Sequence, residues 1–296
     1  MKKVKFKLIN LSPYFFIAPA LIGLLIFKIS PIFQSAWLSL VKYNIINPSA
    51  SEYIGLENFR KLFFGDRFIW QNLWHTVQYS LLTVIPGMVL SLVLALILVE
   101  SWFKFSNLIR SILFLPHIIS ITITSLIWTY IYNPTFGFLN LVLSWFDLPP
   151  QGWIGHPDTA MICVAIAVIW KGLGYNITIW TAGIMGISAE FRDAAKVDGA
   201  NYLQELFYIR LPLLKPVILF LGILGFIGSF QGFDAIYTLT GGGPIRSTEV
   251  IVFHLWRVAF TEYNFGYAAA ISWLIFIILV VLSLFQMKFL GTEEKI

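Results

Sequence analysis

Residues 74–99 read WHTVQYSLLTVIPGMVLSLVLALILV, a run without any lysine, arginine, aspartate or glutamate. Roughly 20 apolar residues suffice for a helix to cross the hydrocarbon core of a bilayer. Five further apolar runs occupy residues 11–40, 111–132, 159–187, 213–237 and 265–289. A crossing segment has to satisfy its own backbone hydrogen bonds in lipid, and the sequence shows no alternating ten-residue pattern of barrel strands. We therefore predict an all-α, polytopic membrane protein of about six transmembrane helices.

The composition supports this prediction. The chain has 296 residues, of which 58% are hydrophobic and only 12% are charged, and its mean hydropathy is +0.80. Soluble domains carry about 25% charged residues, so most of this surface has to face lipid. We expect a first helix and outer loop at 1–72, a transmembrane core at 73–290 with a cytoplasmic loop at 188–212, and a cytoplasmic tail at 291–296.

The distribution of lysine and arginine indicates the orientation. With the N-terminus inside, twelve of the 20 basic residues lie on the inner side and six lie in outer loops, while Lys28 and Lys171 lie inside apolar runs. Basic residues are enriched on the cytoplasmic side of membrane proteins. We therefore expect a multi-pass protein of the cell membrane with both termini in the cytoplasm.

Several other classes of function find no support in the sequence. The net charge of +5 is spread singly between apolar runs, so we expect no nucleic-acid partner. Cys163 is the only cysteine, and the four histidines are scattered without metal-ligand spacing, so neither an intrachain disulfide nor a metal site is expected. The glycine-rich stretch 240–245 lacks the lysine of a phosphate-binding loop, and we expect its glycines to form a tight outer turn.

The loop at 188–212 has the signals of a short helix followed by a second turn. Ser188 is a good N-cap, and Glu190 and Lys196 match the polarity of the helix dipole. Gly199 stands where a left-handed residue ends a helix, and Asn201 can cap the next turn. The sequence therefore predicts an ordered cytoplasmic helix-turn-helix. The element is too short to be a domain, and we expect it to be a docking element.

The same loop resembles a known family. Asp193-Ala194-Ala195, Gly199 and Ile209-x-Leu211-Pro212 are similar to the EAA loop of binding-protein-dependent ABC importers, with Asp193 where the family usually has glutamate. The resemblance implies a coupling helix that inserts into a cytoplasmic ATPase subunit. The residues expected to couple to the ATPase are Glu190, Asp193, Ala194, Ala195, Asp198, Gly199, Ile209, Leu211 and Pro212.

A second resemblance narrows the family to maltose-type carbohydrate permeases. It is carried by residues 53–63, by residues 233–249, and by Ala259-Phe260 followed by residues 265–273, and it extends over about 19–282. It implies a sugar as the substrate.

Polar and aromatic residues interrupt three of the predicted spans, where they are costly and mark a pathway or a helix contact. In the third run, His117, Ser120 and Thr124 share one helix face with Ile121. The fourth run contains Trp170, Lys171, Tyr175 and Asn176, and in the fifth Ser229, Gln231 and Asp234 cluster with Gly232. Ser120 and Thr124 can also bond to their own helix, Lys171 can snorkel, and the glycines can serve packing alone.

By resemblance, the sugar contacts are His117, Ile121, Trp170, Gly172, Tyr175, Ser229 and Gly232, to which the polar cluster adds Gln231 and Asp234. We expect no catalytic residue in this chain. The expected partners are a second homologous permease, two ATPase subunits that carry ATP and magnesium, a solute-binding protein outside, the lipid bilayer and a sugar. A permease for a phosphorylated polyol or other polar solute, and an ion-coupled secondary transporter, are the alternatives.

Overall fold

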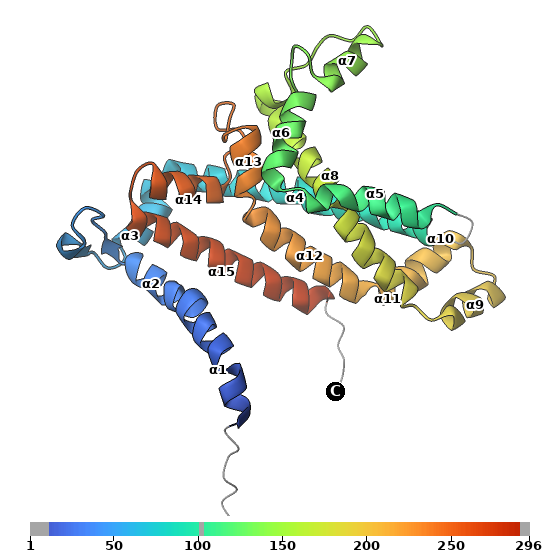
Figure 1. The fold of residues 1–296 in the computed structure, drawn as a ribbon, viewed down its shortest axis with the longest axis horizontal. Helices are drawn as coiled ribbons and strands as arrows, with labels where there is room; N and C mark the ends of the chain where they lie inside the picture. The colour runs from blue at the N-terminus through green and yellow to red at the C-terminus, as the bar shows by residue number, and fades with distance from the viewer. Residues whose placement is uncertain (1–11, 101–103, 291–296) are drawn as a thin grey trace, which may run out of the picture. The chain divides into compact units, whose positions relative to one another are not determined.

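The computed structural model describes residues 12–100 and 104–290. The predicted tail at 291–296, and the terminal lysines used in the orientation argument, lie outside these residues. The described residues form two compact units, one of residues 12–66 and 258–273 and the other of residues 67–100, 104–257 and 274–290. Figure 1 shows the order of the elements, almost all of which are helices.

The first unit contains the first span and a short hairpin. Its elements are α1 (Ser12–Leu24), a π-helical turn (Leu25–Ile29), α2 (Ser30–Leu38), β1 (Val41–Lys42), a 3₁₀ turn (Pro48–Ala50), β2 (Glu52–Tyr53), α3 (Glu57–Arg60) and a second π-helical turn (Lys61–Gly65). The strands pair antiparallel, with Val41 opposite Tyr53. The buried Asn58 side chain donates to the carbonyls of Ser39 and Val41 at 2.9 and 3.3 Å, which fixes the turn after the first span.

The second unit contains the remaining spans. Its elements are α4 (Arg67–Val99), α5 (Ser106–Ile118), α6 (Ile121–Ile131), α7 (Phe138–Ser144), a 3₁₀ turn (Trp153–Gly155), α8 (Pro157–Met185), α9 (Ala189–Val197), α10 (Tyr202–Glu205), a π-helical turn (Leu206–Arg210), α11 (Leu211–Leu213), α12 (Lys215–Phe230) and α13 (Phe233–Leu239). Two helices, α14 (Ile251–Phe260) and α15 (Phe265–Leu290), contribute residues to both units.

Six spans are confirmed only if two of them are counted as broken. Within residues 12–100 and 104–290, four segments are long and apolar enough to cross a membrane alone, namely Phe15–Leu38, Arg67–Val99, Pro157–Met185 and Phe265–Phe289. The other two are bent pairs: α5 and α6 meet at 101°, and the segment Tyr202–Leu213 meets α12 at 66°. The bend between α5 and α6 is visible in Figure 1.

The fifth apolar run differs from a single continuous helix. The predicted run 213–237 ends as a helix at Phe230, and α13 starts a separate short helix at Phe233. Gln231 and Gly232 between them leave the helical conformation, with φ and ψ of −95° and 9° at Gln231 and −71° and 57° at Gly232. Apolar composition alone does not reveal this break.

Two apolar clusters hold the spans of the second unit together. One includes Tyr79, Val164 and Ile236, and the other includes Ile177, Trp180 and further residues of α4, α8 and α12. Lipid tails are as apolar as these side chains, so packing and hydrogen bonds between helices supply the stability. The indole of Trp180 accordingly donates to the hydroxyl of Ser91 at 3.1 Å.

Candidate functional site

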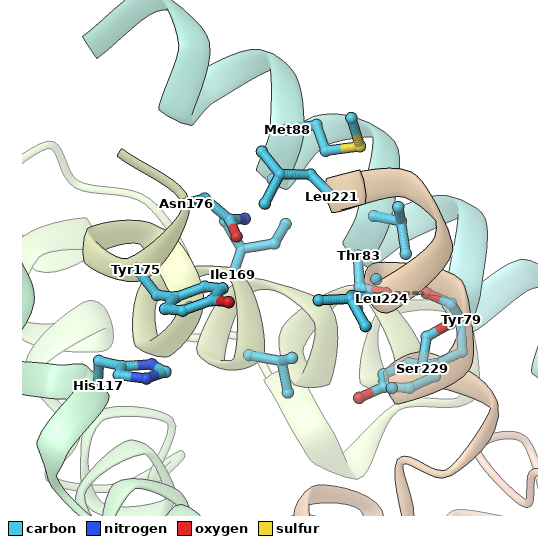
Figure 2. Close-up of a pocket in the computed structure, with 16 residues that line it drawn as sticks. Tyr79, Thr83, Met88, His117, Ile169, Tyr175, Asn176, Leu221, Leu224 and Ser229 are labelled. Carbon is cyan, nitrogen blue, oxygen red and sulfur yellow. Dashed lines mark hydrogen bonds between the residues drawn. The ribbon is translucent and has the colours of Figure 1, made fainter. Parts of the chain in front are cut away.

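A cavity of about 360 Å³ lies between α4, α5, α8 and α12 of the second unit. Its polar lining consists of Tyr79, Thr83, His117, Tyr175, Asn176 and Ser229, and its apolar lining includes Val84, Met88, Val168, Ile169, Leu221 and Leu224. Figure 2 shows His117 and Tyr175 on one side and Tyr79 with Ser229 on the other. Helices from four of the predicted spans thus bring aromatic rings and hydroxyl or amide groups around one space.

The polar groups of the cavity are held by the helices that carry them. The rings of His117 and Tyr175 stack, with centroids 5.1 Å apart and planes at 18°. The hydroxyl of Ser229 donates to that of Ser80 at 2.8 Å, and the hydroxyl of Thr83 donates to the carbonyl of Tyr79 at 2.8 Å. Ser229 therefore contributes more to the contact between α12 and α4 than to the open space.

The structure brings four of the nine predicted path residues to this cavity: His117, Gly172, Tyr175 and Ser229. The other five lie elsewhere. Ile121 packs against the first apolar cluster, the Trp170 ring lies edge-on to Trp128, and a Cβ on Gly232 would meet the ring of Tyr79 at 2.6 Å. Gln231 and Asp234 are exposed at the break between α12 and α13.

Several lining residues escaped the sequence analysis. Tyr79, Thr83 and Met88 lie on α4, and Leu221 and Leu224 lie on α12. The spacing of Tyr79 and Thr83, four residues apart on a helix, is a detectable signal because such residues share a face. The sequence does not show which face of so apolar a span points to a cavity.

The loop between α8 and α12 has the local structure predicted for it. The Ser188 hydroxyl accepts from the amide of Glu190 and caps α9, and Asn201 and Gln204 form a reciprocal capping box at 2.9 and 2.8 Å. Gly199 has a φ of +75°, and the amides of Gly199 and Ala200 bond back to Lys196 and Ala195. This is a Schellman ending, and it confirms the predicted conformation of Gly199.

A buried network of charges contacts α9 through Arg192, and the sequence analysis missed it. Arg210, 2% exposed, donates from Nε to Glu205 at 2.8 Å and lies 3.5 Å from Glu100 at the end of α4. Arg192 of α9 donates to the same oxygen of Glu205 at 3.2 Å. The network therefore connects α9 to α10 and to the end of the second span.

A second ion cluster surrounds Glu249, which lies between the glycine-rich turn and α14. Its carboxylate contacts Arg246 at 2.7 Å, Arg257 at 2.9 Å and His254 at 3.3 Å. Burial alone would raise the pKa of this carboxyl, but the hydrogen bond with His254 and the charges of Arg257 and Arg246 outweigh it and hold the pKa below its usual value. The turn before it contains Gly241 and Gly242 at positive φ, as predicted for a tight turn.

Within residues 12–100 and 104–290, no group of three or more His, Cys, Asp and Glu side chains is placed to hold a metal ion. The arrangement offers a cavity between helices and an ordered loop connected to it through α8 and α12.

Broken membrane spans around a cavity, with a capped helix in one connecting loop, define a helical membrane transport subunit. The family described as "Binding-protein-dependent transport system inner membrane component" matches residues 115–290, and the chain belongs to this family. It is thus a multi-pass membrane protein and a permease subunit, not itself an enzyme, of a binding-protein-dependent ABC transport system that works with partner proteins.

The relatives agree with this assignment. The chain is 36% identical to the probable ABC transporter permease protein YurN of Bacillus subtilis, over 97% of this chain and 98% of the relative. It is 32% identical to the trehalose/maltose transport system permease protein MalF of Thermococcus litoralis, with coverages of 97% and 95%. It is 30% identical to the sn-glycerol-3-phosphate transport system permease protein UgpA of Shigella flexneri, with coverages of 96% and 95%.

Solved structures show the same fold. A chain of a bacterial alginate ABC transporter, crystallised in complex with an alginate pentasaccharide-bound periplasmic protein, superposes with a TM-score of 0.84. The two chains are 25% identical, and the match covers 96% of each.

Proposed function

We propose that this chain forms half of the translocation path of an ATP-driven importer and that its substrate is a neutral saccharide. The observation that carries this proposal is the chemistry of the cavity. Among the described residues that line it, none is Asp, Glu, Lys or Arg, while tyrosine, histidine, threonine and asparagine side chains are present. Aromatic faces and neutral hydrogen-bonding groups suit the C–H faces and hydroxyls of a sugar.

The relatives' names leave both a neutral and an anionic substrate open, since one transports trehalose or maltose and another sn-glycerol-3-phosphate. A phosphate would call for arginine or lysine in the path, because these side chains supply its charge-assisted hydrogen bonds. Lys171 is adjacent in sequence to the lining residue Gly172, but its ammonium contacts the backbone carbonyls of His117 and Ile119. The cavity therefore favours the neutral saccharide.

The partners follow from the same proposal. A second homologous permease completes the path, two ATPase subunits holding ATP and magnesium dock on α9 from the cytoplasm, and a solute-binding protein delivers the sugar outside. The exposed side chains of Phe191 and Val197 on α9 support docking there, because they are 52% and 87% exposed on an ordered helix. The coupling set remains Glu190, Asp193, Ala194, Ala195, Asp198, Gly199, Ile209, Leu211 and Pro212.

The distribution of basic residues supports the further proposal that both termini lie in the cytoplasm. An impermeant maleimide applied to intact cells tests this with single cysteines in a Cys163→Ala background. Labelling is expected for Ser51→Cys and Gly152→Cys and not for Val197→Cys, and the reverse pattern would refute the orientation.

Tyr175→Ala tests the substrate path. Proteoliposomes containing the assembled transporter and its binding protein are supplied with labelled neutral oligosaccharides, uronate oligosaccharides and glycerol phosphate. Loss of one neutral contact costs about 1 kcal/mol, so uptake of the neutral sugar by Tyr175→Ala should fall roughly fivefold with ATPase activity and assembly retained.

Tyr130→Ala is the control, since Tyr130 is 68% exposed on α6 and outside the cavity lining. If the unmodified transporter took up glycerol phosphate and none of the saccharides, the proposed substrate would be an anionic polyol phosphate and not a neutral saccharide. Equal uptake by Tyr175→Ala and the unmodified transporter would remove Tyr175 from the path.

A further inference from the structure

The third span is interrupted within the membrane. Helix α5 ends at Ile118, Ile119 is extended with φ and ψ of −69° and 141°, and Ser120 caps α6 through the amide of Ile123. The last carbonyls of a helix have no partner within it. In lipid such groups need a donor from elsewhere in the protein, because no water is available to bond them.

Lys171 of α8 supplies that donor. Its Nζ lies 2.6 Å from the carbonyl oxygen of Ile119, 3.0 Å from that of His117 and 3.4 Å from that of Pro116. An ammonium group can donate three hydrogen bonds and accepts none, so three carbonyl oxygens match the number of its donors. The negative end of the α5 dipole also favours a cation at this position.

Two neighbours of Lys171 fasten the same end of α5. A Cβ on Gly174 would meet the carbonyl oxygen of Leu113 and the Cα of Phe114, so α8 approaches the α5 backbone directly there. Tyr175, one helical turn after Lys171, stacks on the ring of His117. One face of α8 thus contacts the end of α5 in three ways. It meets the α5 backbone before the break, the ring of His117 and the carbonyls at the break.

We propose that Lys171 is a positioning residue, a tethered cation that holds the break in the third span and thereby keeps His117 at the cavity. Its charge is used for backbone carbonyls and not for the substrate or for the membrane interface. The statement that His117 faces a saccharide path rests on the proposed function. The statement that the Lys171 ammonium holds the break is independent of it and can be tested without any substrate.

Chemical rescue gives the sharpest test. In the purified transporter complex, Lys171→Ala removes the donor and leaves space for a small amine. We expect the melting temperature of this variant to fall by about 5 °C or more, because several charge-assisted hydrogen bonds are lost. Ethylammonium chloride should restore a large part of the loss, whereas tetramethylammonium chloride, which has no N–H, should not.

Lys28→Ala is the matched control. Lys28 is another single lysine inside an apolar span, and its side chain is exposed. Its replacement should change the melting temperature little, and ethylammonium should have no specific effect on it. Equal stability of Lys171→Ala and the unmodified complex, or equal rescue by the two salts, would overturn the proposal.

A second pair of variants covers the case in which Lys171→Ala does not assemble. Lys171→Arg keeps donors at the break and should assemble, whereas Lys171→Met has similar length without a donor and should assemble in lower yield and melt lower. Assembly and melting of Lys171→Met at the level of the unmodified complex would contradict the proposal.

The position of α5 can be read separately from a cysteine at 117. In a Cys163→Ala, His117→Cys background, a water-soluble methanethiosulfonate reagent should label residue 117 at a rate that Lys171→Met lowers at least about fivefold, the factor set by one hydrogen bond. An unchanged rate would show that Lys171 does not hold the break. A lowered labelling rate in Lys171→Met, found together with no saccharide uptake by the unmodified transporter, would count against the proposed function of the cavity and leave the holding of the break by Lys171 supported.

Discussion

Glu249 shows how a single buried charge can be made stable in this protein. The residue is 1% exposed, and its carboxylate is contacted by Arg246, Arg257 and His254 and by the amide of Asn72. Removing one partner of such a group costs about 3–5 kcal/mol, since the remaining charges stay buried. The cluster therefore fixes the start of α14 against α4.

The lowered pKa of Glu249 makes this contribution depend on pH. A carboxyl whose folded pKa is depressed stabilises the protein fully above its unfolded pKa, near 4.5, and loses the contribution as pH falls through the folded value. The melting temperature should thus drop below about pH 4.5, and Glu249→Gln should be less stable at neutral pH with a smaller drop.

Glu57→Gln provides the comparison for that measurement. Glu57 pairs with Arg60 at 3.7 Å while its side chain is 60% exposed, and exposed pairs contribute little. This variant should follow the unmodified protein across the pH range. If Glu249→Gln followed it as well, the cluster would have no stabilising role.

At the scale of the element, the loop helix α9 depends on how its end is formed. Gly199 has a φ of +75° and open space around its Cα. A side chain at this position would therefore meet no crowding. The cost of a substitution is that of the left-handed backbone conformation, about 1–2 kcal/mol for an ordinary residue. Gly199→Val should leave the protein in the membrane but abolish transport and weaken ATPase attachment.

Asparagine tolerates the left-handed region better than other residues, so Gly199→Asn should keep most of the activity. Co-purification of the ATPase subunits and uptake by the two variants provide the measurement. Normal uptake by Gly199→Val at normal expression would refute a docking role for the loop.

The charge network that contacts α9 gives a second prediction for the same element. In Glu205→Gln the guanidinium of Arg210 loses its 2.8 Å carboxylate contact while it stays 2% exposed. We expect a loss of about 3 kcal/mol or more and a higher ratio of ATP hydrolysed to sugar transported, because α9 is no longer tied to α4.

Lys196→Ala breaks an exposed pair in the same loop. Lys196 and Asp193 are 3.4 Å apart, with side chains 65% and 71% exposed, so the expected effect is about 0.5 kcal/mol or less. Melting temperature and the hydrolysis-to-uptake ratio compare the two variants. Similar values for both would show that the buried network carries no coupling.

Local features were predictable from the sequence and long-range ones were not. Ser188, Gly199 and Asn201 act on residues within a few positions of themselves, so their roles can be read from spacing. The contact between Arg210 and Glu100 joins residues 110 positions apart, and no local pattern reveals it.

The breaks in the spans follow the same division. Pro116 signals an irregularity in the third run, but the 101° bend and its donor Lys171 depend on where α8 lies. Gln231, Gly232 and Asp234 lie at the break between α12 and α13 and outside the cavity lining, a placement that a single continuous fifth helix does not predict. An apolar run predicts that a segment lies in the membrane, but it does not predict where the helix in that segment breaks.

At the scale of the whole molecule, apolar runs, loop and cavity describe a permease that needs partners. The chain belongs to the binding-protein-dependent inner membrane components, and the cavity and α9 lie in the same compact unit. In the proposed function, α8 and α12, which flank the loop on either side, are the elements that would carry a movement of α9 to the cavity.

The most direct test of this account measures saccharide uptake and ATP hydrolysis in the same proteoliposomes, with both permeases, the ATPase subunits and the binding protein present. Uptake of a neutral saccharide should require ATP and the binding protein, and should stop when the ATPase subunits carry an inactivating substitution. Uptake that persists without ATP and follows an imposed ion gradient would contradict the account and establish an ion-coupled transporter in its place.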